Sequence, residues 1–166
     1  MSFSLQRMSA TILNRVVVVL AVVLSIYIYQ CGLQKVCGVP ILDSIVRNHI
    51  QVVAPLGTID AEVAQTSAAR RLGLSGRTSL SSGKGMMFIF ETPGKYGFWM
   101  KDMKFDLDIM WIDEEGRIVT IERDVTPDTY PATFINSVNA VRVLELPAGS
   151  AEKYGLFLGS KVSFID

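Results

Sequence analysis

The sequence predicts a mainly β protein with two short helices: a small antiparallel β-sandwich or barrel-like domain behind a single N-terminal transmembrane helix. Three observations predict this class. Short runs in which apolar and polar residues alternate recur after residue 58, and glycine, proline and acidic turn residues separate them. A long apolar stretch lies near the N-terminus. The length of 166 residues suits one domain and an accessory segment.

Residues 16–29 read VVVVLAVVLSIYIY and, with their apolar flanks, approach the ~20 residues that a helix needs to cross a bilayer. A cleaved signal peptide would need small residues where the bulky Tyr29 stands. We therefore expect an uncleaved signal anchor at residues 1–33. Residues 34–57 would be a linker or amphipathic segment, and residues 58–166 a globular β domain.

The basic residues around the predicted span indicate its orientation. Arg7 and Arg15 precede the span, whereas Lys35 and Arg47 follow it. With the free amine, this gives an excess of positive charge on the N-terminal side, which favours an N-terminus inside the cell. We therefore expect a single-pass membrane protein whose C-terminal domain lies outside the cytoplasm, in the periplasm or at the cell surface.

Composition argues against several functional classes. Sixteen basic and 16 acidic residues give a net charge of zero, so no electrostatic argument supports nucleic acid as a partner. Cys31 and Cys37 lack metal-ligand spacing, and we expect unmodified thiols, with a disulfide, a crosslink or palmitoylation as alternatives. His49 is the only histidine, so a zinc enzyme is not expected and no cofactor is predicted.

The segment before the domain allows two interpretations. Apolar residues from Ile41 to Val53 recur at helical spacing, which predicts an amphipathic helix lying on the membrane or against the domain. The stretch Ile50 to Val53 is equally suited to a first strand of the domain. The sequence leaves both open.

The domain begins with a strand and a helix. Ile59, Ala61 and Val63 alternate with acidic residues, which predicts a half-buried strand. Thr66 or Ser67 can then cap a helix that runs to Leu72 and closes at Gly73.

Two predicted strands follow in the middle of the chain. Residues 86–90 are continuously apolar, as in a strand that is buried on both faces. From Asp102 to Trp111 apolar and polar residues alternate, which predicts a strand with one apolar and one solvated face. Turn residues at 91–95 join the two segments, so we expect neighbouring antiparallel strands.

The remaining elements are predicted from the same signals. In order, they are a turn at 113–116, a strand at 117–122, a long loop at 124–137, a strand at 139–146, a short helix at 147–154 and a last strand at 159–165.

Four pieces of sequence carry a resemblance to a known family: AEVAQTSAARRLGLSGRTSL, KGMMFIFETP, FWMKDMKFDLDIMWID and VLELPAGSAEKYGLFLGSKV, which occupy residues 61–80, 84–93, 98–113 and 143–162. In order and spacing they resemble the prokaryotic domain of unknown function family 192, DUF192, over about residues 59–165. The resemblance implies a small, mainly β domain that is often found behind a signal peptide or membrane anchor. It implies no established activity.

The chain departs from the family pattern at three positions. The family usually has asparagine at the position of Asp102, proline at that of Asp106, and often aspartate at that of Ser160. Asp106 in place of proline predicts that the strand continues through this position, and it places one more carboxylate beside Asp108.

Two groups of residues are candidates for ligand binding. Trp99 and Met100 offer a large apolar surface next to Lys101, a combination that suits a sugar, peptide or lipid. The alternative is that Trp99 belongs to the core. Arg77, with two arginines of the predicted helix, can bind an anionic group, although surface ion pairs are the commoner role of such residues.

Carboxylates form the candidate catalytic and metal sites. Asp102, Asp108 and Glu145 are candidate acid and base residues of a hydrolase, since the sequence has no nucleophile motif. Asp106 and Asp108 are candidate ligands for a hard cation, but a single strand face is too flat for calcium and Lys104 would repel it. We therefore predict no metal site.

Three hypotheses about function remain. The first is a non-enzymatic, membrane-tethered module that binds a ligand or partner in the cell envelope through Trp99 to Lys101 and the 124–137 loop. The second is a carboxylate-based hydrolase of envelope glycans. The third is a structural component of an envelope complex that uses the amphipathic segment at 38–54. A glycan, a peptide or a protein is the expected partner.

Overall fold

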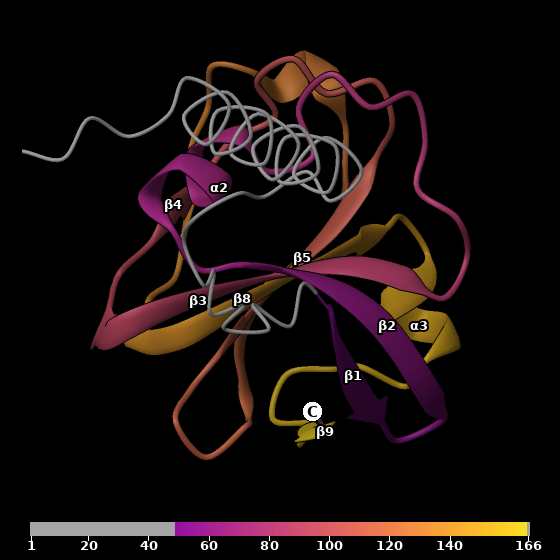
Figure 1. Ribbon diagram of the computed structural model, residues 1–166, viewed down its shortest axis with the longest axis vertical. Helices are drawn as coiled ribbons and strands as arrows, with labels where there is room; N and C mark the ends of the chain where they lie inside the picture. The colour runs from indigo at the N-terminus through magenta and orange to yellow at the C-terminus, as the bar shows by residue number, and fades with distance from the viewer. Residues whose placement is uncertain (1–48, 166) are drawn as a thin grey trace, which may run out of the picture. The chain divides into compact units, whose positions relative to one another are not determined.

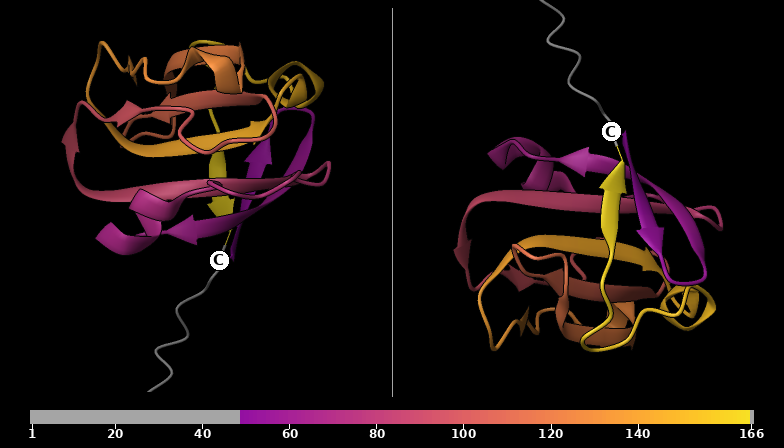
Figure 2. Two further views of the ribbon diagram at one scale, coloured as in Figure 1. Left: turned by 90° about the horizontal axis from the view of Figure 1, so that it is seen from above. Right: turned by 90° about the horizontal axis from the view of Figure 1, so that it is seen from below.

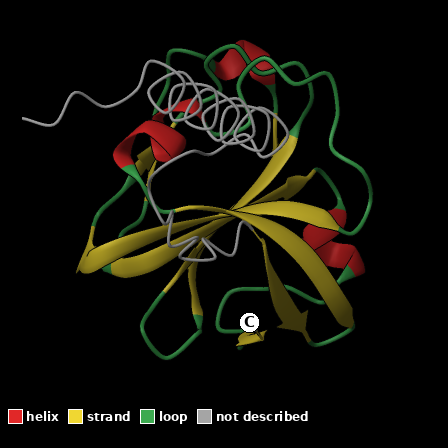
Figure 3. Cartoon of the chain, viewed as in Figure 1, coloured by secondary structure: helices red, strands yellow, loops and turns green. Residues whose placement is uncertain are grey.

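The computed structural model describes residues 49–165, which form a strongly curved β-sheet with short helices at its edges (Figures 1 and 3). The predicted anchor and the first part of the predicted amphipathic segment lie outside the described residues. Within residues 49–165, no helix is long and apolar enough to cross a membrane.

Seven strands form the main sheet in the order β6-β5-β8-β3-β2-β1-β9. Their bounds are β1 His49–Ala54, β2 Gly57–Ala64, β3 Lys84–Gly94, β5 Leu107–Ile112, β6 Ile118–Val125, β8 Ala140–Pro147 and β9 Ser163–Ile165. A small second sheet pairs β4 Gly97–Phe98 with β7 Phe134–Ile135. The helices are α2 Ser67–Leu72, the 3-10 turn η1 Pro127–Thr129, and α3 Ser150–Lys153.

The mainly β composition and the two short α-helices are confirmed, but the predicted antiparallel sandwich or barrel is wrong. The main sheet is mixed, because β2 and β3 pair in parallel. Parallel neighbours need a crossover connection, and the segment containing α2 provides it. Arg117 and Lys161 form one isolated bridge between the two edges of the sheet, which otherwise stays open.

The first strand resolves the ambiguity left by the sequence. Residues 49–54 form β1, which pairs with β2 on one side and with β9 on the other. Val52 is fully buried in this strand. This part of the predicted amphipathic segment is therefore a strand of the domain.

The central strands differ most from the prediction. β3 and β5 are not neighbours, because β8 lies between them and pairs with both. The predicted strand at 102–111 begins only at Leu107, and every residue of β5 is buried. Asp106 therefore precedes the strand, so the expectation that the strand continues through it is wrong. Asp108 does not lie on a solvated face, because β5 is covered on both sides.

The two faces of the sheet pack two separate clusters of apolar side chains. One cluster contains Met87, Met110 and Leu144 and is closed by Ala151 of α3. The other contains Phe88, Trp111 and Val143 and is closed by residues next to α2. Because side chains alternate along a strand, neighbouring residues enter opposite clusters. Figures 1 and 2 show α2 and α3 at opposite ends of the curved sheet.

The helix boundaries follow their capping residues. The hydroxyl of Thr66 accepts a hydrogen bond from the N–H of Ala69 and starts α2, and Gly73 ends the helix at a positive φ of 51°, as predicted. The second predicted helix begins later than expected, because Pro147 still belongs to β8 and α3 starts at Ser150.

Candidate functional site

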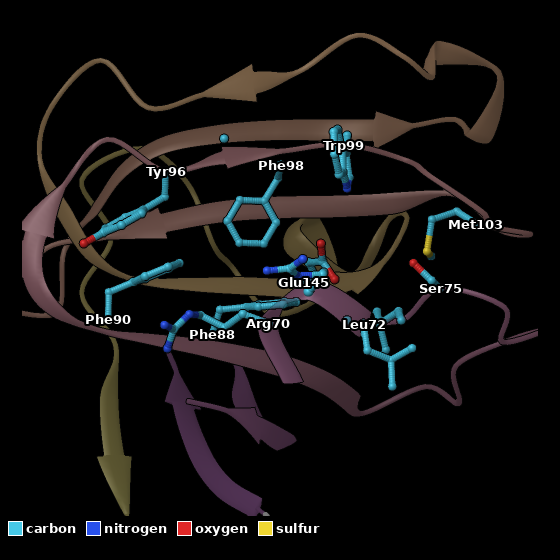
Figure 4. Close-up of a pocket in the computed structure, with 14 residues that line it drawn as sticks. Arg70, Leu72, Ser75, Phe88, Phe90, Tyr96, Phe98, Trp99, Met103 and Glu145 are labelled. Atoms are coloured by element: carbon cyan, nitrogen blue, oxygen red, sulfur yellow. The ribbon is translucent and has the colours of Figure 1, made fainter. Parts of the chain in front are cut away.

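A pocket of about 260 Å³ opens between α2, β3 and the segment around β4 (Figure 4). Figure 4 shows Tyr96, Phe98 and Trp99 on one side of the pocket and Phe88 and Phe90 on the other, with Glu145 between the two sides. The 14 lining residues are Arg70, Arg71, Leu72, Gly73, Leu74, Ser75, Phe88, Phe90, Tyr96, Gly97, Phe98, Trp99, Met103 and Glu145.

Glu145 comes from β8, in the middle of the main sheet. In the strand register it lies opposite Met86 of β3 and Ile109 of β5, and both of these residues are buried. The Glu145 side chain is therefore flanked by apolar neighbours and is only 5% exposed. Burial raises the pKa of its carboxyl group to about 8, so at neutral pH the group is mostly protonated.

No charged group of the described part of the chain offsets this burial. Burial alone accounts for the raised pKa of Glu145, and within residues 49–165 its carboxyl group has neither a hydrogen-bond partner nor an ion-pair partner. The carboxyl oxygens are not sealed off, because the Thr120 hydroxyl is the one fully buried polar side-chain atom without a partner in residues 49–165, so the Glu145 carboxyl group reaches the cavity. A titratable group with a raised pKa at a cavity wall is a candidate for a functional role.

The aromatic side chains form a connected wall. The Phe88 and Phe98 rings meet edge to face with centroids 4.8 Å apart, and Phe98 makes a similar contact with Trp111 at 5.8 Å. Phe90 and Tyr96 stack with centroids 3.5 Å apart. These contacts fix the rings, so the shape of the pocket is largely set before any ligand arrives.

Hydrogen bonds hold the segment that leads into β4. The buried amide of Asn136 accepts from the backbone N–H of Tyr96 at 2.7 Å and donates to the carbonyl of Gly94 at 2.9 Å. The indole N–H of Trp111 donates to the carbonyl of Tyr96 at 2.8 Å. Asn136 and Trp111 thus position the Tyr96–Phe98 wall from behind.

Arg70 of α2 is built into the wall rather than free. Its guanidinium donates to the carbonyl of Ile89 at 3.0 Å and to that of Gln65, and it lies 5.0 Å over the centroid of the Phe90 ring. These contacts fasten α2 to β3. Arg71 is exposed and lies at the edge of the pocket.

The end of the pocket is closed by two loops that are tied together. The Ser75 hydroxyl donates to the carbonyl of Lys101 at 2.9 Å, and the N–H of Gly76 donates to the carbonyl of Asp102 at 2.9 Å. The loop after α2 and the loop after Trp99 therefore act as one wall.

The predicted ligand-binding residues lie in different environments. Trp99 lines the pocket and is 52% exposed. Its ring lies edge to face with that of Tyr130, with the ring centroids 6.3 Å apart. Met100 is buried in the core cluster beneath, and Lys101 is exposed outside the pocket lining. Arg77 does not line the pocket.

Arg77 forms an ion pair instead. Its guanidinium donates to both carboxylate oxygens of Glu62, at 2.6 and 2.8 Å. The Arg77 guanidinium lowers the pKa of the Glu62 carboxyl, and the carboxylate raises the pKa of Arg77. This pair joins the loop after α2 to strand β2.

The candidate acids are not brought together. Asp102 and Asp106 are exposed, and Asp102 has a positive φ of 57°. Asp108 is buried and accepts backbone hydrogen bonds from Asp124 at 3.0 Å and Ala151 at 2.8 Å. Glu145 is the one carboxylate among the residues that line the pocket. A two-carboxylate hydrolase therefore lacks its second group at this site.

The same arrangement offers no site for a hard cation. Asp106 lies at the surface, and both Asp108 oxygens face backbone N–H groups, which a cation would have to replace. No cluster of three or more metal-ligating side chains occurs in the described part of the chain.

Most of the pocket was not predicted from the sequence. The sequence indicates Glu145 as a candidate acid or base or as an ion-pair partner, not as the polar group of an apolar pocket, and it does not predict the roles of Phe88, Phe98 and Tyr96. One sequence feature does point to Glu145. It occupies the same face of β8 as Val141 and Val143, so a carboxylate lies where an apolar residue is expected.

Fold and site together define a small mixed-sheet domain whose aromatic pocket contains a buried glutamate. The family model of DUF192, described as an uncharacterized ACR, matches residues 50–164. The chain therefore belongs to the DUF192 family, a family of unknown function. No curated protein matches the chain.

Two solved structures share this fold. One is a protein from Sinorhizobium meliloti 1021 that is described as a putative transcription regulator; it has 26% identity and a TM-score of 0.64, covering 70% of this chain and 92% of its own. The other is a protein of unknown function from Novosphingobium aromaticivorans DSM 12444, with 29% identity and a TM-score of 0.62, covering 69% of this chain and 83% of its own.

Proposed function

We propose that this domain is a non-enzymatic binding module whose pocket holds a small ligand with an apolar body. One observation carries the proposal: the buried carboxyl group of Glu145, which has no partner within residues 49–165, faces a preformed cavity with aromatic walls. Binding sites of this kind combine an apolar lining with a few polar groups that fix the orientation of the ligand.

The size of the cavity limits the ligand. At about 260 Å³ it lies just below the range of about 300–1,000 Å³ that is typical for drug-sized molecules. One or two rings, or a short branched chain, would fill it. A long glycan or peptide would place one terminal group inside and leave the rest at the rim, where Trp99 and Leu72 are exposed.

A thermal-shift screen of the full-length protein in lipid nanodiscs tests the proposal. Small aromatic and aliphatic compounds are compared with envelope sugars and short peptides. A ligand at ~100 times its dissociation constant adds about 2.7 kcal/mol to the stability, which gives a clear shift in a domain of this size. We expect shifts with compounds that have an apolar body.

Trp99→Ala and Phe157→Ala form a matched pair of variants for this screen. Both side chains are about half exposed, at 52% and 51%, but only Trp99 lines the pocket. We expect Trp99→Ala to weaken binding and Phe157→Ala to leave it unchanged. Equal effects of the two variants, or no shift with any compound, would contradict the proposal.

We further propose that residues 1–33 tether this module to a membrane, with the domain outside the cytoplasm. The apolar stretch at 16–29 and the basic residues before it support this location. Protease treatment of intact cells tests it. The domain is expected to be digested before lysis, and protection until lysis would contradict the orientation.

A further inference from the structure

Glu145 gives the pocket its one buried polar end. Its neighbours across the sheet, Met86 and Ile109, are apolar, and its carboxyl group has no partner within the described residues. A ligand group that pairs with this carboxyl would recover the free energy that burial costs. The chemistry of that group therefore decides which ligands the pocket prefers.

The aromatic rings near Glu145 favour a cation. Phe88, Phe98 and Trp99 line the same cavity, and the faces of such rings attract ammonium groups. Aromatic faces recognise cationic ligands, and a cation that is shielded from water also needs a paired carboxylate.

The charged and titratable groups of the surrounding elements do not compensate Glu145. From α2, Arg70 is bound to backbone carbonyls and stacked on Phe90, and Arg71 lies exposed at the edge. From the segment before β4, the Tyr96 hydroxyl donates to the carbonyl of Thr92. The lining residues of β3 are apolar. Neither arginine shifts the pKa of Glu145.

We propose that the ligand carries an aliphatic ammonium group on an apolar or aromatic body, and that this ammonium pairs with the Glu145 carboxylate. This inference rests on the proposed binding function. Below about pH 8 the empty pocket holds Glu145 in its protonated form. Binding of an ammonium group therefore ionises Glu145, and the carboxyl proton passes to the solvent while the ligand keeps its charge.

Three probes with the same indole ring separate charge from shape. Tryptamine carries an ammonium group, 3-methylindole is neutral, and indole-3-acetate carries a carboxylate. Isothermal titration of the full-length protein in lipid nanodiscs is expected to give tryptamine an affinity at least about tenfold higher than that of 3-methylindole. Indole-3-acetate should bind most weakly, since its carboxylate would meet the buried acid.

Glu145→Gln is the decisive variant, because it keeps the size and the neutral polarity of the protonated side chain. It is expected to remove the preference for tryptamine while 3-methylindole still binds. Titration at pH 6.5 in buffers of different ionisation enthalpy adds an independent readout. The wild-type protein should release nearly one proton for each tryptamine bound, and the variant none.

The outcomes distinguish this inference from the proposed function. If 3-methylindole or indole-3-acetate binds as tightly as tryptamine, or if Glu145→Gln leaves tryptamine binding unchanged, the ammonium inference is overturned and the binding function stands. If none of the three probes binds, and Glu145→Gln restores no binding, both are overturned.

Discussion

Asp108 and Glu145 lie on adjacent strands of the main sheet, but their side chains enter opposite faces. In the register of β5 and β8, Asp108 is opposite Leu146 and Glu145 is opposite Ile109. Residues that face each other across a ladder point to the same side, so one carboxylate enters each core. Asp108 supports the backbone, whereas Glu145 faces the pocket.

Asp108 is expected to be a main determinant of stability. Its two carboxylate oxygens accept hydrogen bonds from the N–H groups of Asp124 and Ala151. These bonds tie β6 and the start of α3 to β5. Asp108→Ala would leave both N–H groups without this acceptor and cost about 2–4 kcal/mol. Urea unfolding followed by tryptophan fluorescence measures this loss.

The exposed Asp106 provides the control for that measurement, since Asp106→Ala should change the stability by less than about 0.5 kcal/mol. Equal losses for the two variants would show that the hydrogen bonds of Asp108 contribute little.

The stability of the domain is expected to depend on Glu145 at alkaline pH. The folded pKa of about 8 is above the ordinary value of 4.5, so the folded state binds more protons than the unfolded state between these values. The contribution of protonated Glu145 to the free energy of unfolding is therefore fully present below pH 4.5 and is lost as the pH rises through 8. The difference corresponds to at most about 5 kcal/mol.

Glu145→Gln separates this effect from that of other groups. The variant should match the wild type near pH 5 and exceed it in stability near pH 9, as measured by urea unfolding across this range. Asp60 and Glu62 have lowered pKa values and lose their contributions only at lower pH, so they do not obscure the comparison. Parallel pH profiles of variant and wild type would mean that the carboxyl is not buried in solution.

Replacing Asp102 by asparagine is expected to increase the stability of the domain. Its φ of 57° lies in the left-handed region, which asparagine and glycine adopt more readily than most residues. Asp102→Asn should stabilise the domain by up to about 1 kcal/mol, and Asp102→Val should destabilise it. Thermal unfolding measures both, and a gain with valine would contradict the backbone argument.

Arg77 is expected to act in stability and not in ligand binding. Arg77→Lys keeps the charge but loses the two-pronged contact with Glu62. The pair is about one-third exposed on both sides, so solvent screening limits the expected loss to less than about 1 kcal/mol. Affinity for pocket ligands should stay the same. A clear drop in affinity at unchanged stability would mean that Arg77 contributes to ligand binding.

The sequence predicted well those elements that depend on local signals. The cap at Thr66 and the glycine at 73 gave the bounds of α2, and the turn at 113–116 gave the β5–β6 hairpin. Such features depend on neighbouring residues, so one sequence is enough to find them.

The order of strands could not be predicted in the same way. β8 inserts between β3 and β5, and this long-range pairing leaves no local signal in any of the three strands. The alternating sequence pattern places Asp108 on a solvated face. However, β5 is covered on both faces, and Asp108 accepts backbone hydrogen bonds there. The pocket was missed for the same reason: its walls come from segments that only the strand order brings together.

The most direct test of the pocket is the NMR spectrum of the full-length protein with ¹³C-methyl-labelled methionine during titration with tryptamine. Met86 is next to Glu145 and Met103 lines the pocket, whereas Met87 and Met110 lie on the opposite face of the sheet. We predict that the signals of Met86 and Met103 shift with increasing ligand and that those of Met87 and Met110 stay in place. Equal shifts of all four signals, or of none, would contradict a ligand site at Glu145.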